Sequence, residues 1–194
     1  MFIGDSMKVK VAVSARHIHL TKEDVDILFG RNYELTKRND LSQMGQYACE
    51  EVVTIKTEKL ELNLRVLGPV RSYTQAEVSR TDAYKLGINP PVRDSGDVLG
   101  SEKVTIIGPK GTIENKECCI IADRHIHMSN DDALAYGLKH GDIVSVKVDG
   151  LKGGIMNNVH IRVADNFTLE MHIDTDDANA FLLNGKEVLE VIKD

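Results

Sequence analysis

"RHIHL" at residues 16–20 and "RHIHM" at residues 124–128 are almost the same segment, and their first histidines lie 108 positions apart (125 − 17 = 108). The similarity continues without a gap, because "VAVSARHIHLTKEDV" (11–25) aligns with "CIIADRHIHMSNDDA" (119–133). In each copy a β-rich apolar run leads into Arg-His-x-His, and an apolar residue and a helix start follow. The two segments therefore indicate an internal duplication.

Short helices and alternating strands are expected around these repeats. Each helix start has a Ser or Thr followed three residues later by Asp, which is capping-box spacing with Asp in place of Glu: Thr21 with Asp24, and Ser129 with Asp132. We expect the first helix to end at Gly30 and the second near Gly137. Two further helices are expected after Thr81 and after Asp174. Apolar and polar residues alternate, as in half-buried strands, in residues 51–68, 142–150 and 158–165.

This pattern predicts a mainly β fold with short α-helices, arranged as two tandem, duplication-related β-barrel domains. The join is expected within residues 88–103, where two prolines and two glycines gather. The predicted domains are residues 1–95 and residues 96–194.

Composition narrows the function classes. The 194 residues carry a net charge of −6, so there is no excess of Lys and Arg to bind nucleic acid broadly. No apolar run approaches the roughly 20 residues that span a bilayer, and the start lacks the apolar core of a secretory signal. We therefore expect a cytoplasmic protein without nucleic-acid or membrane partners. The odd number of cysteines (Cys49, Cys118 and Cys119) suggests reduced thiols, which we interpret as inert core residues.

The two His-x-His pairs are candidate metal ligands. Alternate side chains of a strand project from one face, so His17 and His19 point the same way, as do His125 and His127. Two imidazoles on one face are a common way to supply two ligands to zinc. A surface feature, or core histidines bonded to backbone, would explain one pair equally well. Two pairs in matching contexts favour the metal interpretation.

Each metal site needs a third protein ligand. Alternation in "FTLEMHIDTD" (167–176) places His172 on the polar face of a strand, so we rank it above His140 and His160. The carboxylate candidate is Glu77, in "GPVRSYTQAEVSRTD" (68–82). The same stretch carries Arg71, whose planar fork could bind phosphate, although such polar groups also occur in ordinary turns. From the residues alone, phosphoryl chemistry and a dinuclear zinc hydrolase fit equally well.

Five segments resemble the PduL-type phosphotransacylases, also called phosphate propanoyltransferases. They are "SARHIHLTKEDVDILFG" (14–30), "LGPVRSYTQAEVSRTDAYKLGI" (67–88), "PVRDSGD" (91–97), "IIADRHIHM" (120–128) and "FTLEMHIDTDDANA" (167–180). The resemblance runs in the same order from about residue 8 to about residue 182. It implies two β-barrel domains with a dinuclear zinc site between them, and the reaction of acyl-CoA and phosphate to acyl phosphate and CoA.

The resemblance also implies a role for each site residue. Two zinc ions per chain are expected, one held by His17, His19 and Glu77 and the other by His125, His127 and His172. Arg71 is expected to bind phosphate. Residues expected to line the CoA channel are Ser14, Arg65 and Asn179.

Direct attack of phosphate on the thioester is the mechanism that we expect. Zinc can act as template and Lewis acid, and Arg71 can aim a phosphate oxygen at the carbonyl. We find no Ser-His-Asp pattern and no reactive cysteine in the sequence, so no acyl-enzyme is expected. The alternatives are a zinc hydrolase of a thioester or phosphoester, and a binding module with purely structural zincs. The latter is disfavoured because structural sites usually have four protein ligands and only three are identifiable per metal.

Several properties stay open at this level. Acetyl and propanoyl groups differ by one methylene, so the preferred acyl chain is not readable. The sequence also leaves open whether the chain forms a homo-oligomer. Only seven residues precede Lys8, so no microcompartment-targeting extension is expected.

Overall fold

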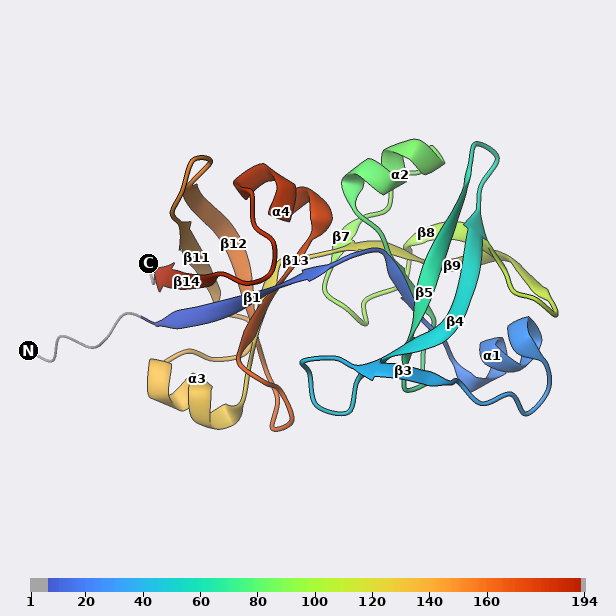
Figure 1. The fold of residues 1–194 in the computed structure, drawn as a ribbon, viewed down its shortest axis with the longest axis horizontal. Helices are drawn as coiled ribbons and strands as arrows, with labels where there is room; N and C mark the ends of the chain where they lie inside the picture. The colour runs from blue at the N-terminus through green and yellow to red at the C-terminus, as the bar shows by residue number, and fades with distance from the viewer. Residues whose placement is uncertain (1–6, 193–194) are drawn as a thin grey trace, which may run out of the picture. The chain divides into compact units, whose positions relative to one another are not determined.

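The computed structural model describes residues 7–192, which form two compact units. One unit, the first barrel, consists of residues 15–122. The other, the second barrel, consists of residues 7–14 and 123–192. Both are built mainly of strands (Figure 1). The mainly β, two-barrel fold class predicted from the sequence is confirmed.

The first barrel is a closed ring of six strands in the order β9-β6-β2-β5-β4-β8, with β8 pairing back onto β9. Its strands are β2 (His17–His19), β4 (Tyr47–Lys56), β5 (Glu61–Gly68), β6 (Gln75–Glu77), β8 (Glu102–Ile107) and β9 (Thr112–Ala122). Two short strands pair with the ring from outside, β3 (Lys37–Asp40) with β4 and β7 (Val92–Arg93) with β9. The helices of this unit are α1 (Lys22–Phe29) and α2 (Arg80–Leu86).

The second barrel is a closed ring in the order β1-β13-β10-β12-β11-β14. Its strands are β1 (Lys8–Ser14), β10 (His125–Met128), β11 (Ile143–Val148), β12 (Gly154–Val163), β13 (Glu170–Asp174) and β14 (Val188–Ile192). Its helices are α3 (Asn130–Tyr136) and α4 (Thr175–Phe181).

The two rings are equivalent strand for strand, which confirms the duplication. In both, the His-x-His strand is parallel to one neighbour (β5 or β12) and antiparallel to the other (β6 or β13). The remaining pairs also match in direction around each ring. One ancestral pairing scheme therefore accounts for both barrels.

The compact units do not follow the tandem division at residue 95 that the sequence predicted. Strand β1 precedes the first His-x-His pair but pairs with β13 and β14 of the second barrel. Its counterpart β9 precedes the second His-x-His pair but pairs with β6 and β8 of the first barrel. The two repeats thus exchange their leading strands. The proline- and glycine-rich stretch lies within the first barrel, whose ring β8 and β9 complete.

Local capping signals determine the helix ends. The Thr21 side chain accepts a hydrogen bond from Asp24 N, and Ser129 forms a full capping box with Asp132. Gly137 closes α3 in the left-handed conformation that glycine tolerates best. Helix α2, which was expected after Thr81, begins slightly earlier than predicted, because Ser79 is its N-cap.

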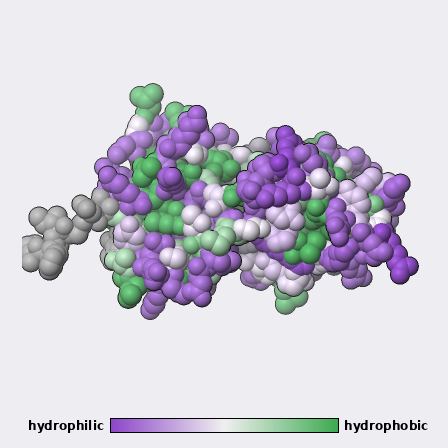
Figure 2. Space-filling model, turned by 60° about the horizontal axis from the view of Figure 1, so that its bottom comes forward, coloured by the Kyte–Doolittle hydropathy of each residue, from purple (hydrophilic) through white to green (hydrophobic). Residues whose placement is uncertain are grey.

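Each barrel encloses its own apolar core. Val, Ile and Leu side chains from the ring strands dominate both clusters, together with residues of the covering helices. Hydrophilic residues cover much of the face seen in Figure 2, with hydrophobic residues showing between them. No helix within residues 7–192 is long and apolar enough to cross a membrane.

Candidate metal and phosphate site

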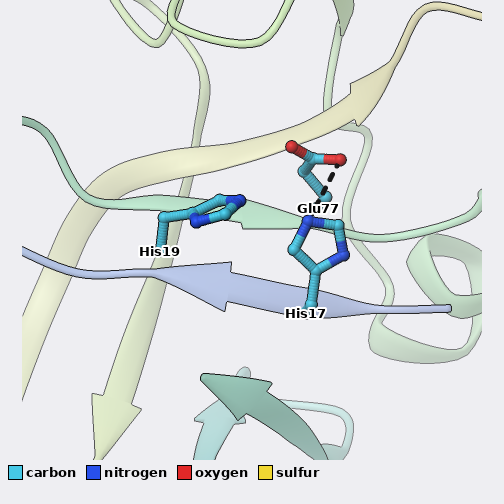
Figure 3. Close-up of side chains that lie close together, drawn as sticks. All are labelled: His17, His19 and Glu77. Carbon is cyan, nitrogen blue, oxygen red and sulfur yellow. Dashed lines mark ion pairs between the residues drawn. The ribbon is translucent and has the colours of Figure 1, made fainter. Parts of the chain in front are cut away.

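Strand pairing brings Glu77 to the first His-x-His pair. In the antiparallel register of β2 and β6, His17 lies opposite Glu77 and His19 lies opposite Gln75. The ligand atoms of His17, His19 and Glu77 all lie within 4.8 Å of one another (Figure 3). The predicted ligand set of the first zinc is therefore assembled within one barrel.

The ring of His17 is oriented as a metal ligand requires. Its Nδ1 lies 2.9 Å from the Ala15 carbonyl oxygen, to which an Nδ1–H can donate. That hydrogen bond leaves Nε2 available, and Nε2 lies 3.4 Å from a carboxylate oxygen of Glu77. Two ligands of one tetrahedral zinc ion, each about 2 Å from the metal, are separated by about this distance. A backbone partner on the second ring nitrogen is the usual support for a metal-binding histidine.

The pKa values of His17 and His19 are shifted in opposite directions. Burial by itself would lower the pKa of His17, but the Glu77 carboxylate and the Ala15 carbonyl outweigh it and raise the pKa. Burial lowers the pKa of His19 well below its usual value, and the charges of His17 and Arg71 act in the same direction. The Nδ1 atom of His19 is buried and has no hydrogen-bond partner. A neutral imidazole with an unsatisfied buried nitrogen suits a metal ligand, so these residues fit the implied zinc ion.

The second barrel gathers the other predicted ligands. His125 lies opposite His172 in the β10–β13 register, the same relation that His17 has to Glu77. The ring centroids of His125, His127 and His172 are 4.7–5.2 Å apart. His125 Nδ1 lies 2.7 Å from the Asp123 carbonyl oxygen, which repeats the contact of His17 with Ala15. Three imidazoles brought together in this way match the donor chemistry of a second zinc site.

Arg71 is held beside the first cluster by the backbone. The loop after β5 is fastened where Arg71 N–H donates to the Leu20 carbonyl, just after the His-x-His strand. Its guanidinium contacts the hydroxyls of Tyr73 and Ser95, each at 3.4 Å. Arg71 is also close enough to contribute to the lowered pKa of His19. A cation next to the metal ligands suits an anionic substrate such as phosphate.

The three residues expected to contact CoA lie in different elements. Ser14 ends β1 and Asn179 is exposed on α4, both in the second barrel. Arg65, on β5, donates to the carbonyl oxygens of Cys49 and Glu50, where the register between β4 and β5 shifts. This contact gives Arg65 a structural role, since a bulge leaves carbonyls outside the strand ladder. Contact of these three residues with CoA stays a prediction.

The cysteines are buried, as the sequence predicted. Burial raises the pKa of Cys49 to about 11 and that of Cys118 to about 12, and it raises the pKa of Cys119 further. Thiols with such pKa values are almost entirely protonated at neutral pH. None of the three is suited to act as a nucleophile.

Comparison with known proteins identifies the family. Residues 10–184 match the family model described as phosphate propanoyltransferase. The chain belongs to the phosphate propanoyltransferase family. A phosphate propanoyltransferase of Lachnoclostridium phytofermentans is 53% identical over 186 residues, which cover 95% of this chain and 87% of that protein. Family membership makes this chain an enzyme, a phosphotransacylase.

Other members of the phosphate propanoyltransferase family are similarly close. The relative from Thermotoga maritima is 51% identical over 94% of this chain and 88% of its own length. The relative from Priestia megaterium is 56% identical over 92% of this chain and 83% of its own length. The resemblance noted in the sequence is thereby confirmed over most of the chain.

Sequence reasoning missed one feature of the site. No strand was predicted at residues 75–77, whereas the structure forms strand β6 there, from Gln75 to Glu77. In a strand, residues two apart share a face, so Gln75 projects on the same side as Glu77. The alternation Gln75, Ala76, Glu77 was the signal, but three residues are too few for a periodic pattern to stand out.

Proposed function

We propose that this chain is a zinc-dependent phosphate acyltransferase that interconverts a short-chain acyl-CoA and phosphate with acyl phosphate and CoA. The observation that carries the proposal is the cluster of His17, His19 and Glu77 with Arg71 beside it. Each barrel brings together three candidate ligands, so we propose two zinc ions per chain. A propanoyl group is the proposed acyl substrate, following the family description, and an acetyl group, which is one methylene shorter, is the alternative.

The chain's own residues would hold the metals and the phosphate. His17, His19 and Glu77 would hold one zinc, and His125, His127 and His172 the other. When bound, zinc supplies Lewis acidity toward the thioester carbonyl and neutralises negative charge. The Arg71 guanidinium would bind two phosphate oxygens and orient a third toward the carbonyl carbon.

The proposed reaction is a direct displacement. A phosphate oxygen forms a bond to the thioester carbonyl carbon, the carbon–sulfur bond breaks, and CoA leaves as the thiolate. No enzyme nucleophile is needed, and the raised pKa values of the buried cysteines agree with that. Arg71 would reduce the repulsion between the phosphate dianion and the developing oxyanion.

An assay of CoA release tests the proposal. Purified protein with zinc is incubated with acetyl-CoA, propanoyl-CoA and butanoyl-CoA, each with and without phosphate, and both CoA thiol and acyl phosphate are measured. We expect CoA release to require phosphate and to match acyl phosphate formation one to one. One methylene of pocket burial is worth about 0.8 kcal/mol, so acetyl and propanoyl rates should differ by only about fourfold.

Other outcomes would point elsewhere. Release of CoA without phosphate would identify a thioester hydrolase. Initial rates with a ping-pong pattern would show a covalent acyl-enzyme and contradict direct displacement. Cytoplasmic location stays a prediction.

A further inference from the structure

Gln75 contacts the metal-ligand candidate Glu77 from within the same strand. Its side chain is fully buried, and its Nε2 donates to Glu77 Oε1 at 2.6 Å. The other carboxylate oxygen, Oε2, faces Nε2 of His17. Gln75 therefore occupies one oxygen of the carboxylate and leaves the other directed at His17.

The amide of Gln75 can adopt only one orientation. Its Oε1 accepts a hydrogen bond from the backbone N–H of Gly96 at 2.7 Å. A backbone N–H can only donate, so the amide oxygen must face Gly96 and the amide nitrogen must face Glu77. The backbone after β7 thus determines which end of the amide meets the carboxylate.

Ser95 connects Gln75 to Arg71. Gln75 Nε2 also donates to Ser95 Oγ at 2.8 Å, and Arg71 Nη1 lies 3.4 Å from the same hydroxyl oxygen. A continuous set of hydrogen bonds therefore runs from Arg71, the proposed phosphate-binding residue, to Glu77, the proposed metal ligand. All of its members belong to the first barrel.

The second barrel uses the equivalent strand position in a similar way. In register, Gln75 lies opposite His19, and Glu170 lies opposite His127. Glu170 Oε2 lies 3.3 Å from Nε2 of His172, the third ligand candidate of that barrel. The residue two before the third ligand therefore contacts that ligand in both repeats.

We propose that Gln75 is a positioning residue that orients the Glu77 carboxylate for metal binding and, through Ser95, aligns Arg71 with the bound metal. This inference rests on the proposed zinc and phosphate sites. Outer partners of metal ligands commonly change metal affinity or activity by about 10- to 100-fold when removed. Loss of the Gln75 amide should weaken both zinc binding and phosphate binding, because the amide contacts Glu77 directly and Arg71 through Ser95.

The test uses Gln75→Met, which keeps the side-chain length but removes both hydrogen-bonding groups. Zinc affinity is measured by competition with a chromogenic chelator, and the KM for phosphate and kcat are measured in saturating zinc. We expect one of two zinc ions to bind about 10- to 100-fold more weakly. In saturating zinc, the KM for phosphate should rise by about tenfold with a smaller change in kcat.

Two further variants separate positioning from stability. Thr74→Val is the matched control, because Thr74 is also buried on this segment but its side chain bonds to Asp24 and Thr21 rather than to Glu77. Thr74→Val should lower the melting temperature but leave both zinc affinities and the KM for phosphate within about twofold. The double variant Glu77→Gln, Gln75→Met should bind zinc as weakly as Glu77→Gln alone, because Gln75 acts through the Glu77 carboxylate.

The outcomes discriminate the inference from the proposed function. If the wild type binds zinc but Gln75→Met binds it equally well with an unchanged KM, Gln75 is only a structural residue. A wild type that binds no zinc would overturn both proposals. Should Gln75→Met fail to fold, Ser95→Ala removes one contact of the amide and should produce a smaller change in the same two quantities. Unchanged zinc affinity and KM in Ser95→Ala would also contradict the inference.

Discussion

Arg71 is the residue on which the phosphate proposal depends. Its guanidinium contacts the hydroxyls of Tyr73 and Ser95 and lies over the Tyr73 ring, with 5.9 Å from Cζ to the ring centroid. Hydroxyl groups hold the fork in place without neutralising its charge. Such an arginine is free to pair with an anionic ligand.

Arg71→Ala should therefore raise the KM for phosphate and lower kcat with zinc content unchanged. A charge-assisted bidentate contact in a partly dry site is worth about 2–4 kcal/mol, or roughly a 30- to 1,000-fold loss in kcat/KM for phosphate. Arg71→Lys should recover only part, because lysine restores the charge but not the fork. Steady-state kinetics with varied phosphate and a zinc assay test this. Phosphate kinetics near wild type, with lower stability, would assign Arg71 a structural role.

At the scale of elements, each barrel fastens its His-x-His strand to a helix with an ion pair. Arg16 precedes β2 and pairs with Asp82 of α2 at 3.2 Å, and Arg124 precedes β10 and pairs with Asp177 of α4 at 2.7 Å. Each of these helices directly follows the strand that carries the third ligand candidate. The repeated arginine of Arg-His-x-His thus has a structural role in both copies.

Asp82→Ala should lower the free energy of unfolding by about 1–2 kcal/mol. The Asp82 side chain is only 7% exposed, whereas its partner Arg16 is 41% exposed and can return to water. Lys37→Ala is the control, since it breaks an exposed ion pair. The side chain of Lys37 is 51% exposed and that of its partner Asp40 is 72% exposed. That change should cost less than about 0.5 kcal/mol. Urea unfolding of both variants measures the difference, and equal losses would contradict a tether role for Asp82.

At the scale of the whole molecule, the barrels should not depend on the metals for folding. Each has its own apolar core, and neither core cluster includes the proposed ligands. Structural zinc sites that drive folding occur mainly in domains too small to bury such cores.

Chelation should therefore abolish phosphate-dependent acyl transfer before it unfolds the protein. We expect about two zinc ions to be released per chain, with far-ultraviolet circular dichroism unchanged and activity restored by added zinc. Metal analysis, activity and thermal unfolding on the same sample test this. Loss of secondary structure in step with loss of zinc would make the metals structural.

Much of the site could be predicted because its information is local. His17 with His19, and His125 with His127, are adjacent positions of a strand face, and period-two geometry alone puts each pair together. Helix starts at Thr21 and Ser129 were also readable, because a cap is a contact between residues three apart. By contrast, Gln75 and Ser95 are 20 positions apart, and no local pattern relates them.

The sequence by itself determined the duplication, the mainly β class, the His-x-His pairs and the family resemblance, since all of these are carried by residue order and short-range periodicity. Only the tertiary structure decided which barrel each leading strand joins. Strand β1 places Ala12 beside His172 of β13, and its counterpart β9 places Ile120 beside Glu77 of β6. Because these two contacts are equivalent, each leading strand could pair either with its own repeat or with the other repeat. Local pattern is the same in both arrangements. The choice is made by long-range strand pairing, whose loop-closure cost and packing gain depend on the whole chain.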